Sequence, residues 1–345
     1  MDITASPLVA KKNYASVDLF KFVAAILIIA LHTNPLGFDS LSLGYTMNYV
    51  VYRNAVPFFF IASAFFLFSK PFTWDSAKRY CKRLIILVLA WFLWEFPYVI
   101  YTQIINDPGD FETKINAFYR MMFWESPTPG GWFMFACLQS VLLMYLLAVK
   151  CRFKDWMLLV VGVLMYSVSV FNSAYKGIAE GYPMVSAIVE MVRIITHSPS
   201  FNVFAGFIYF VIGRMIAKGS RLPMKWCIAF VVLFGGLEFV EMYGLWRTGS
   251  IVLNDNFYML IPTSYFLFQL CLNLKVNLPG KFASFMRKSS IIYYLLQFIL
   301  ISIFTRILYI GNGLVVFALV LACVSAASFL IIKKSEQYPW LKNLY

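Results

Sequence analysis

Two ionisable side chains lie eleven residues apart in the first apolar stretch of the chain, residues 14–35: the cation Lys21 and the imidazole His32. In a helix they would fall within roughly 20° of one face, with a rise of roughly 16 Å between them. Ionisable groups inside a lipid-length helix are costly, so each indicates a function. The imidazole could accept and return a proton, and the ammonium could bind an anion.

Each of these residues also has a structural interpretation. His32 could hydrogen-bond a neighbouring helix, and Lys21 could extend its charge to the membrane interface. Arg53, four residues before Pro57, is a second cation within an apolar stretch, and we expect it to bind an anion or to pair with a carboxylate. Its possible partners, which the sequence cannot distinguish, are Glu95, Glu238 and Glu241.

The composition predicts an all-α, polytopic membrane protein. The 345 residues are 61% hydrophobic and 13% charged, well below the roughly 25% charged residues of soluble proteins. Apolar runs long enough to cross a bilayer recur along the chain. We expect about ten transmembrane helices, near residues 16–35, 45–69, 84–104, 130–149, 155–173, 200–217, 226–246, 257–274, 290–309 and 314–332.

The basic residues indicate how the bundle is oriented. The net charge is +13, and most Lys and Arg side chains fall in the segments that join alternate spans, which the positive-inside rule places in the cytoplasm. We therefore expect a cytoplasmic tail at 1–15, a membrane domain at 16–332 and a cytoplasmic tail at 333–345. This distribution argues against nucleic-acid binding.

Other features limit the kinds of site to expect. None of the six cysteines lies in a CxxC pair, so we expect neither disulfides nor a metal site. Two outer segments, 105–129 and 174–199, are long enough for interfacial helices, and the second contains the amphipathic run VSAIVEMVRII.

Five local patterns, in order along the chain, resemble the acyltransferase 3 family of integral membrane acyltransferases. The first is Lys21 ten intervening residues before His32, within ASVDLFKFVAA and the residues that follow it. The others are RNAVPFFFIASAFF, GGWFMFACL, FIYFVIGRMIAK and SSIIYYLLQFIL. Three positions depart from the family pattern. Lys21 replaces the usual arginine, and Gly131 and Gln297 stand where histidines are common.

The resemblance implies an enzyme that transfers an acyl group, commonly acetyl, from cytoplasmic acyl-CoA to a hydroxyl of a cell-surface glycan or lipid-linked sugar. His32 would be the general base or would briefly carry the acyl group, and Arg53 would stabilise the oxyanion or orient the donor. Lys21 would hold the CoA phosphates, and Glu95 and Trp132 are the substrate-binding candidates. Acyl-CoA would be a co-substrate, with no bound cofactor. The implied location is a bacterial plasma membrane, with membrane lipids as further partners.

A second class of function fits the same residues. A bundle with buried charges would also suit a small-solute transporter, for an amino-acid-like solute, or a glycan flippase. A membrane scaffold without turnover is a third possibility. Dependence on His32 and acyl-CoA distinguishes the enzyme from the other two.

Overall fold

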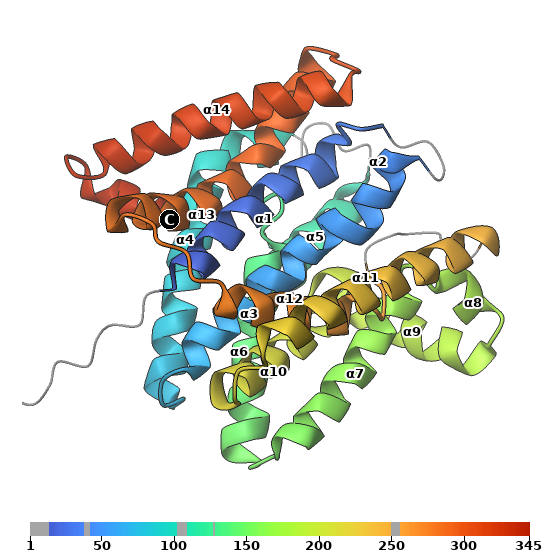
Figure 1. Cartoon of the computed structure of the whole chain (residues 1–345). Coiled ribbons are helices and arrows are strands. Elements are labelled where there is room, and N and C mark those ends of the chain that lie inside the picture. Colours follow the sequence, from blue (N-terminus) through green and yellow to red (C-terminus); the bar gives the residue numbers. More distant parts are fainter. Residues whose placement is uncertain (1–13, 38–41, 102–108, 127, 250–255) are drawn as a thin grey trace, which may run out of the picture.

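The computed structural model describes residues 14–37, 42–101, 109–126, 128–249 and 256–345. Helices account for most of this part of the chain, and it contains no strand. The helices form one bundle, with α14 along one side, α1 in the middle and α7 on the opposite side (Figure 1). The all-helical class predicted from composition is confirmed.

Eight helical segments in the described residues are long and apolar enough to span a membrane. These are Ala15–Thr33, Leu43–Phe68, Trp74–Ile100, Trp132–Lys150, Pro199–Lys218, Met224–Arg247, Gly280–Ile307 and Gly313–Lys334. Two shorter helices, α7 (Asp155–Phe171) and α12 (Leu260–Asn273), lie at the remaining two expected positions. The chain is thus a multi-pass membrane protein.

The long α1 (Ala15–Thr33) and the helices around it form the centre of the bundle. α1 packs against α13 (Gly280–Ser302), α3 (Ala55–Phe68) and α14 (Gly313–Lys334). The central α10 (Val203–Lys218) packs against α3, α7 and α6 (Trp132–Met144). α11 (Met224–Arg247) packs on α12.

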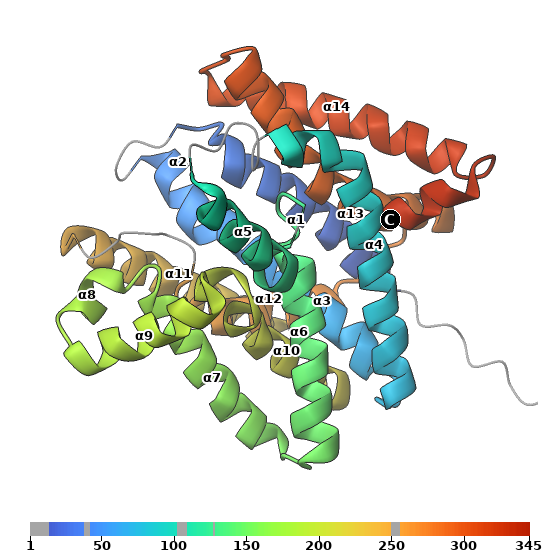
Figure 2. The ribbon, with the colours of Figure 1, turned by 180° about the vertical axis from the view of Figure 1, so that it is seen from behind.

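The remaining elements are short. They are α2 (Leu43–Thr46), η1 (Met47–Val51), η2 (Tyr52–Asn54), α5 (Phe111–Arg120), η4 (Met121–Glu125), η5 (Tyr145–Lys150), α8 (Lys176–Glu180), α9 (Pro183–Thr196), η6 (Pro199–Phe201), η7 (Ile303–Ile307) and η8 (Pro339–Leu344). α5 crosses the back of the bundle (Figure 2). α5 and α9 confirm the predicted helices in the two outer segments.

Two helices begin earlier than the sequence predicts. α4 (Trp74–Ile100) begins ten residues before the expected position 84, because Thr73 and Ser76 form a reciprocal capping box at its start. α13 likewise begins at Gly280, directly after Pro279, rather than at 290. Hydropathy locates only the lipid-length part of such a helix, whereas these first turns carry basic side chains.

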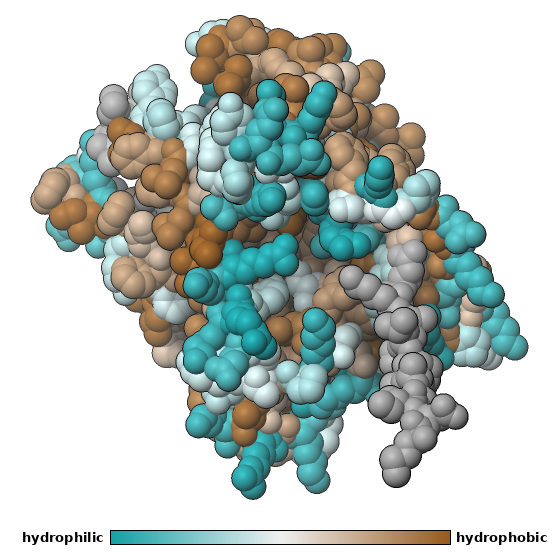
Figure 3. Space-filling model, turned by 90° about the vertical axis from the view of Figure 1, so that its left-hand side faces the viewer, coloured by the Kyte–Doolittle hydropathy of each residue, from teal (hydrophilic) through white to brown (hydrophobic). Residues whose placement is uncertain are grey.

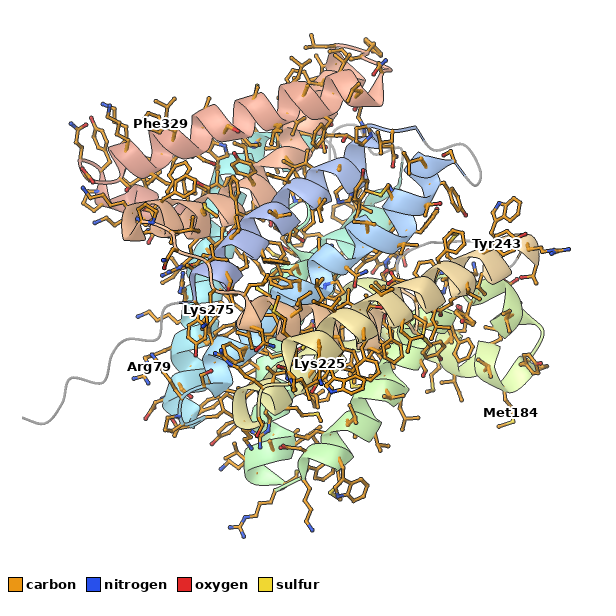
Figure 4. The ribbon with its side chains drawn as sticks, viewed as in Figure 1. Arg79, Met184, Lys225, Tyr243, Lys275 and Phe329 are labelled. Carbon is orange, nitrogen blue, oxygen red and sulfur yellow. The ribbon has the colours of Figure 1, made fainter. Side chains whose placement is uncertain are left out.

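Basic side chains mark one end of the bundle. Arg79 and Lys275 lie on the left-hand side in Figure 4, while Met184 and Tyr243 lie on the right. Viewed from the left-hand side, hydrophilic side chains cover the middle of the surface and hydrophobic ones lie along its margins (Figure 3). We call this surface the basic end.

Candidate active site

One cavity brings together three of the residues that the sequence singled out, His32, Arg53 and Trp132. We call it the histidine cavity, and it encloses about 610 Å³ of empty space, open solvent included. Its other lining residues are mostly apolar or aromatic: Ile28, Leu31, Val56, Pro57, Phe60, Ser200, Phe201, Ala205, Tyr209, Asn256, Leu260 and Tyr294. An apolar cavity with a few convergent polar groups is typical of a small-molecule site.

His32 lies in the last turn of α1, where the helix end is fixed by two asparagines. Asn34 adopts the left-handed conformation and donates its backbone N–H to the Ala30 carbonyl. The Asn48 side chain donates to the Leu31 carbonyl (3.1 Å) and to the Asn34 side-chain oxygen (2.6 Å). These bonds satisfy carbonyls and polar groups of the helix end, so the backbone that carries the imidazole is held in place.

Arg53 lies where a π-helical turn, η1, passes into the 3₁₀ turn η2. Pro57 has no N–H to donate to the Arg53 carbonyl, so a regular helix is interrupted here. π-type irregularities in helices frequently occur at functional sites. The guanidinium carbon of Arg53 lies 5.9 Å from the centre of the Tyr49 ring, within the range of a cation–π interaction.

A buried hydrogen-bond group supports the segment beside Arg53. The Asn54 amide donates to both carboxyl oxygens of Glu238, at 3.2 and 3.1 Å, and to the Val50 carbonyl at 2.8 Å. Ser264 donates to the Asn54 side-chain oxygen at 3.1 Å. Glu238 is fully buried, so these bonds join α11 and α12 to the turn that positions Arg53.

Trp132 begins α6 after a tight turn. Ser126 has a positive φ of 98°, and its hydroxyl lies 3.1 Å from that of Thr128. A Cβ on Gly131 would collide with these two hydroxyls, which explains why a residue without a side chain occupies this position. The indole packs edge-on against Phe201 at 5.3 Å, so its ring forms a fixed wall of the histidine cavity.

Neutral polar side chains also line the histidine cavity. The Asn256 amide donates to the Ser169 hydroxyl and to the Ser200 carbonyl. Tyr209 donates to the Tyr166 hydroxyl at 3.0 Å. The cavity therefore offers hydrogen-bonding groups next to aromatic faces.

A second, larger cavity lies toward the basic end of α1. It encloses about 1520 Å³, open solvent included, and we call it the lysine cavity. Four cations line it: Lys21, Lys70, Arg79 and Arg83. Its other lining residues are Phe59, Ser63, Phe66, Leu67, Ser76, Tyr80, Leu84, Leu87, Phe133, Met134, Ser290, Ile291, Tyr294 and Leu295, and no carboxylate is among them.

Lys21 makes no ion pair with a described residue. Its ammonium lies 5.9 Å from the centre of the Phe59 ring. The nearest acidic residue along α1, Asp18, is almost fully buried and forms a two-bond salt bridge with Arg287 of α13, at 2.8 and 2.6 Å. Asp18 is therefore paired with Arg287, and Lys21 has no acidic partner within ion-pair distance among the described residues.

Tyr294 of α13 lines both cavities. Its hydroxyl donates to the Gly130 carbonyl at 2.8 Å. Its ring lies 5.7 Å from that of Phe133, which lines the lysine cavity. A partition of aromatic rings thus separates the space next to His32 from the space next to Lys21.

The three glutamates have different surroundings. Glu95, predicted to bind substrate, lines neither cavity. It is 1% exposed in the last two turns of α4, and the described residues offer its carboxyl oxygens no hydrogen bond. Glu238 bonds Asn54, as described above. Glu241 accepts from Tyr175 and from the backbone N–H groups of Tyr258 and Met259. Burial and the Glu241 charge raise the pKa of Tyr175, which therefore remains a neutral donor.

The sequence analysis did not single out several residues that line the histidine cavity, because no local sequence pattern marks them as functional. Tyr294 lies within the pattern SSIIYYLLQFIL, yet an aromatic residue in an apolar helix is usually part of the core. Ser200 and Tyr209 lie in the segment Pro199–Lys218, whereas Asn256 comes from a later part of the chain, and folding brings them together. A positive φ at Ser126 is not visible in a sequence either.

Comparison with known families adds an independent observation. The acyltransferase 3 family model, described as an acyltransferase domain, matches residues 14–333, which is nearly the whole chain.

Distant relatives also match. Two proteins named amino-acid racemase, both from Enterococcus faecalis, are each 23% identical, over 76% and 91% of this chain. A serine/alanine racemase from Enterococcus gallinarum is 22% identical over 74% of the chain. The matches cover 36%, 45% and 37% of those proteins, so the chain spans less than half of their length. No solved structure matches it.

Proposed function

This chain belongs to the acyltransferase 3 family and is a membrane acyltransferase, and we propose that it moves an acyl group, most simply acetyl, from acyl-CoA to a hydroxyl of a glycan or lipid-linked sugar. The expected location is a bacterial plasma membrane, with the basic end in the cytoplasm.

The observation that carries the proposal is the pair of cavities on the two sides of Tyr294. The lysine cavity combines four cations with a largely apolar lining, which suits a ligand made of phosphates and an uncharged arm. Acyl-CoA has this composition. With its phosphates near Lys21, the pantetheine arm would extend along α1 past Tyr294, toward the histidine cavity.

In the histidine cavity, His32 would act as a general base. It would take the proton of the acceptor hydroxyl while the oxygen attacks the thioester carbonyl. Arg53 would stabilise the negative charge that develops on the carbonyl oxygen. The carbon–sulfur bond would then break, and the imidazolium would return the proton to the thiolate, giving the ester and free CoA. Transfer through an acyl-histidine would use the same groups in two steps.

The acceptor would lie against the aromatic wall. Trp132, Phe60 and Phe201 offer flat faces for the C–H side of a sugar ring, and Asn256 and Ser200 lie nearby to meet hydroxyl groups. Lipid-linked or surface glycans are acceptors that a site within the membrane could reach. Glu95 lies outside both cavities, so the proposal gives it no direct contact with the acceptor.

The test is acyl transfer by purified protein in proteoliposomes. Acetyl-CoA labelled in the acetyl group would be supplied with a mixture of lipid-linked sugars, for wild type, His32→Ala and His197→Ala. His197 ends α9 and lines neither cavity, so it is the matched control. We expect label in the lipid fraction with wild type and His197→Ala, and background levels with His32→Ala.

A transporter would give a different result. If no variant transfers label or binds acetyl-CoA, and labelled amino acids or sugars enter the vesicles instead, the enzyme proposal is wrong. Because the relatives are named as amino-acid and serine/alanine racemases, amino acids would be the first solutes to supply, beginning with serine and alanine.

A further inference from the structure

A smaller pocket lies at the basic end, between the first turns of α4 and the C-terminal helix η8. Its lining residues are Arg79, Lys82, Arg83, Ile86, Leu87, Lys342, Asn343 and Tyr345. Four of these side chains are cationic, and no acidic side chain lines the pocket. Such a concentration of one charge favours a phosphate group.

The four cations have no acidic partner among the described residues. The salt bridge near the start of α4 joins Asp75 to Lys78, which does not line the pocket. Arg79, Lys82, Arg83 and Lys342 are all exposed, so a bound anion would meet charges that no acidic side chain of the described residues neutralises. Like charges held together without a counter-ion favour anion binding.

Folding of the C-terminal segment places Lys342 at this pocket. The indole N–H of Trp91 donates to the Leu344 carbonyl at 3.1 Å, and Leu341 and Leu344 are buried. The hydroxyls of Tyr345 and Ser335 lie 2.7 Å apart. The sequence predicted only a cytoplasmic tail over 333–345, whereas within it Pro339–Leu344 form the 3₁₀ helix η8, which docks on α4.

The pocket adjoins the lysine cavity, because Arg79, Arg83 and Leu87 line both. A ligand with two separate phosphate groups could therefore bind in both spaces at once. The two shared arginines would contact the part of the ligand between them.

We propose that this pocket binds the 3′-phosphate of the CoA donor, while the lysine cavity binds its diphosphate and pantetheine arm. The proposal rests on the proposed function, because it assigns a further part of the same donor. A phosphate could also come from an anionic lipid, whose acyl chains would lie against the exposed Ile86. The experiment distinguishes these two sources.

The measurement is the dissociation constant of acetyl-CoA and of acetyl-3′-dephospho-CoA, in neutral-lipid nanodiscs, for wild type and Lys82→Gln/Lys342→Gln. Wild type should bind acetyl-CoA about tenfold more tightly, because hydrogen bonds to charged groups are among the stronger ones. The double variant should bind the two donors with nearly equal constants. Lys225→Gln, which changes a cation in the first turn of α11 that lines neither space, should retain the wild-type preference.

Three results would overturn the assignment. If wild type binds the two donors equally and still transfers the acetyl group, the pocket does not bind the 3′-phosphate, and the proposed function is unaffected. If the double variant still prefers acetyl-CoA to acetyl-3′-dephospho-CoA, the 3′-phosphate binds at another place. The pocket is a lipid site if three observations hold together. Anionic phosphatidylglycerol in the nanodiscs changes the activity of wild type, the double variant loses that response, and the double variant keeps the wild-type preference between the two donors. Failure of wild type to bind either donor contradicts the proposed function itself.

Discussion

The lysine cavity and the histidine cavity lie along the same helix but differ in what they offer a ligand. The lysine cavity has four cations and no lining carboxylate, so long-range charge attraction would dominate binding there. The histidine cavity has one guanidinium, one imidazole, neutral polar groups and aromatic faces. Shape and short-range hydrogen bonds would dominate binding there. The difference suggests that one region captures an anionic donor and the other performs the chemistry.

This division predicts that losing Arg53 affects turnover rather than donor capture. Arg53→Gln should lower kcat by about 10²-fold, the usual effect of removing one oxyanion-stabilising group, with the dissociation constant of acetyl-CoA unchanged. Transfer assays at saturating donor, together with calorimetric titration, measure both. Arg247→Gln, exposed at the end of α11, is the control. An unchanged kcat in Arg53→Gln would remove this residue from the chemistry.

Tyr294 tests whether the two cavities communicate. Tyr294→Trp enlarges the partition and should lower transfer by about tenfold through misplacement of the thioester, without weakening donor binding. Tyr294→Phe keeps the ring and loses only the hydrogen bond to Gly130, so its transfer rate should stay within a few-fold of wild type. Equal transfer rates in Tyr294→Trp and wild type would mean that the donor does not pass this side chain.

Trp132 should have the smallest effect, and on the acceptor alone. Trp132→Ala removes an aromatic face whose contact contributes about 0.5–1.5 kcal/mol, so the KM for the acceptor should rise about two- to tenfold. Trp226→Ala, an exposed tryptophan at the start of α11, controls for the general loss of an indole. If Trp132→Ala changed the donor constant instead, the aromatic wall would belong to the donor site.

The sequence predicted the bundle and the central pair because both depend on local information. Hydropathy locates spans, and the 3.6-residue period places Lys21 and His32 on one face. The grouping of His32, Arg53 and Trp132 in one cavity also matches the roles expected from the family resemblance, although their catalytic and binding functions stay predictions. The same reasoning favoured Glu95, because any ionisable residue inside a span suggests function, yet it lies away from both cavities.

Other features depend on contacts between distant segments. The docking of η8 on α4 joins Leu344 to Trp91, and no local pattern signals such a pairing. Asn54, Glu238 and Ser264 come from three helices, so their hydrogen bonds become visible only after folding. Thr73 and Ser76 form a capping pattern that indicates the true start of α4, but the apolar stretch used to place the helix begins about ten residues later.

The most direct test compares His32→Ala with Lys21→Gln in one experiment that measures the dissociation constant of acetyl-CoA and kcat at saturating donor. We expect His32→Ala to lower kcat by about 10²–10⁴-fold with donor binding kept. Lys21→Gln should weaken donor binding by about tenfold or more and retain most of kcat. If both variants change the same constant, or if neither changes either, the division of α1 between donor capture and chemistry is wrong.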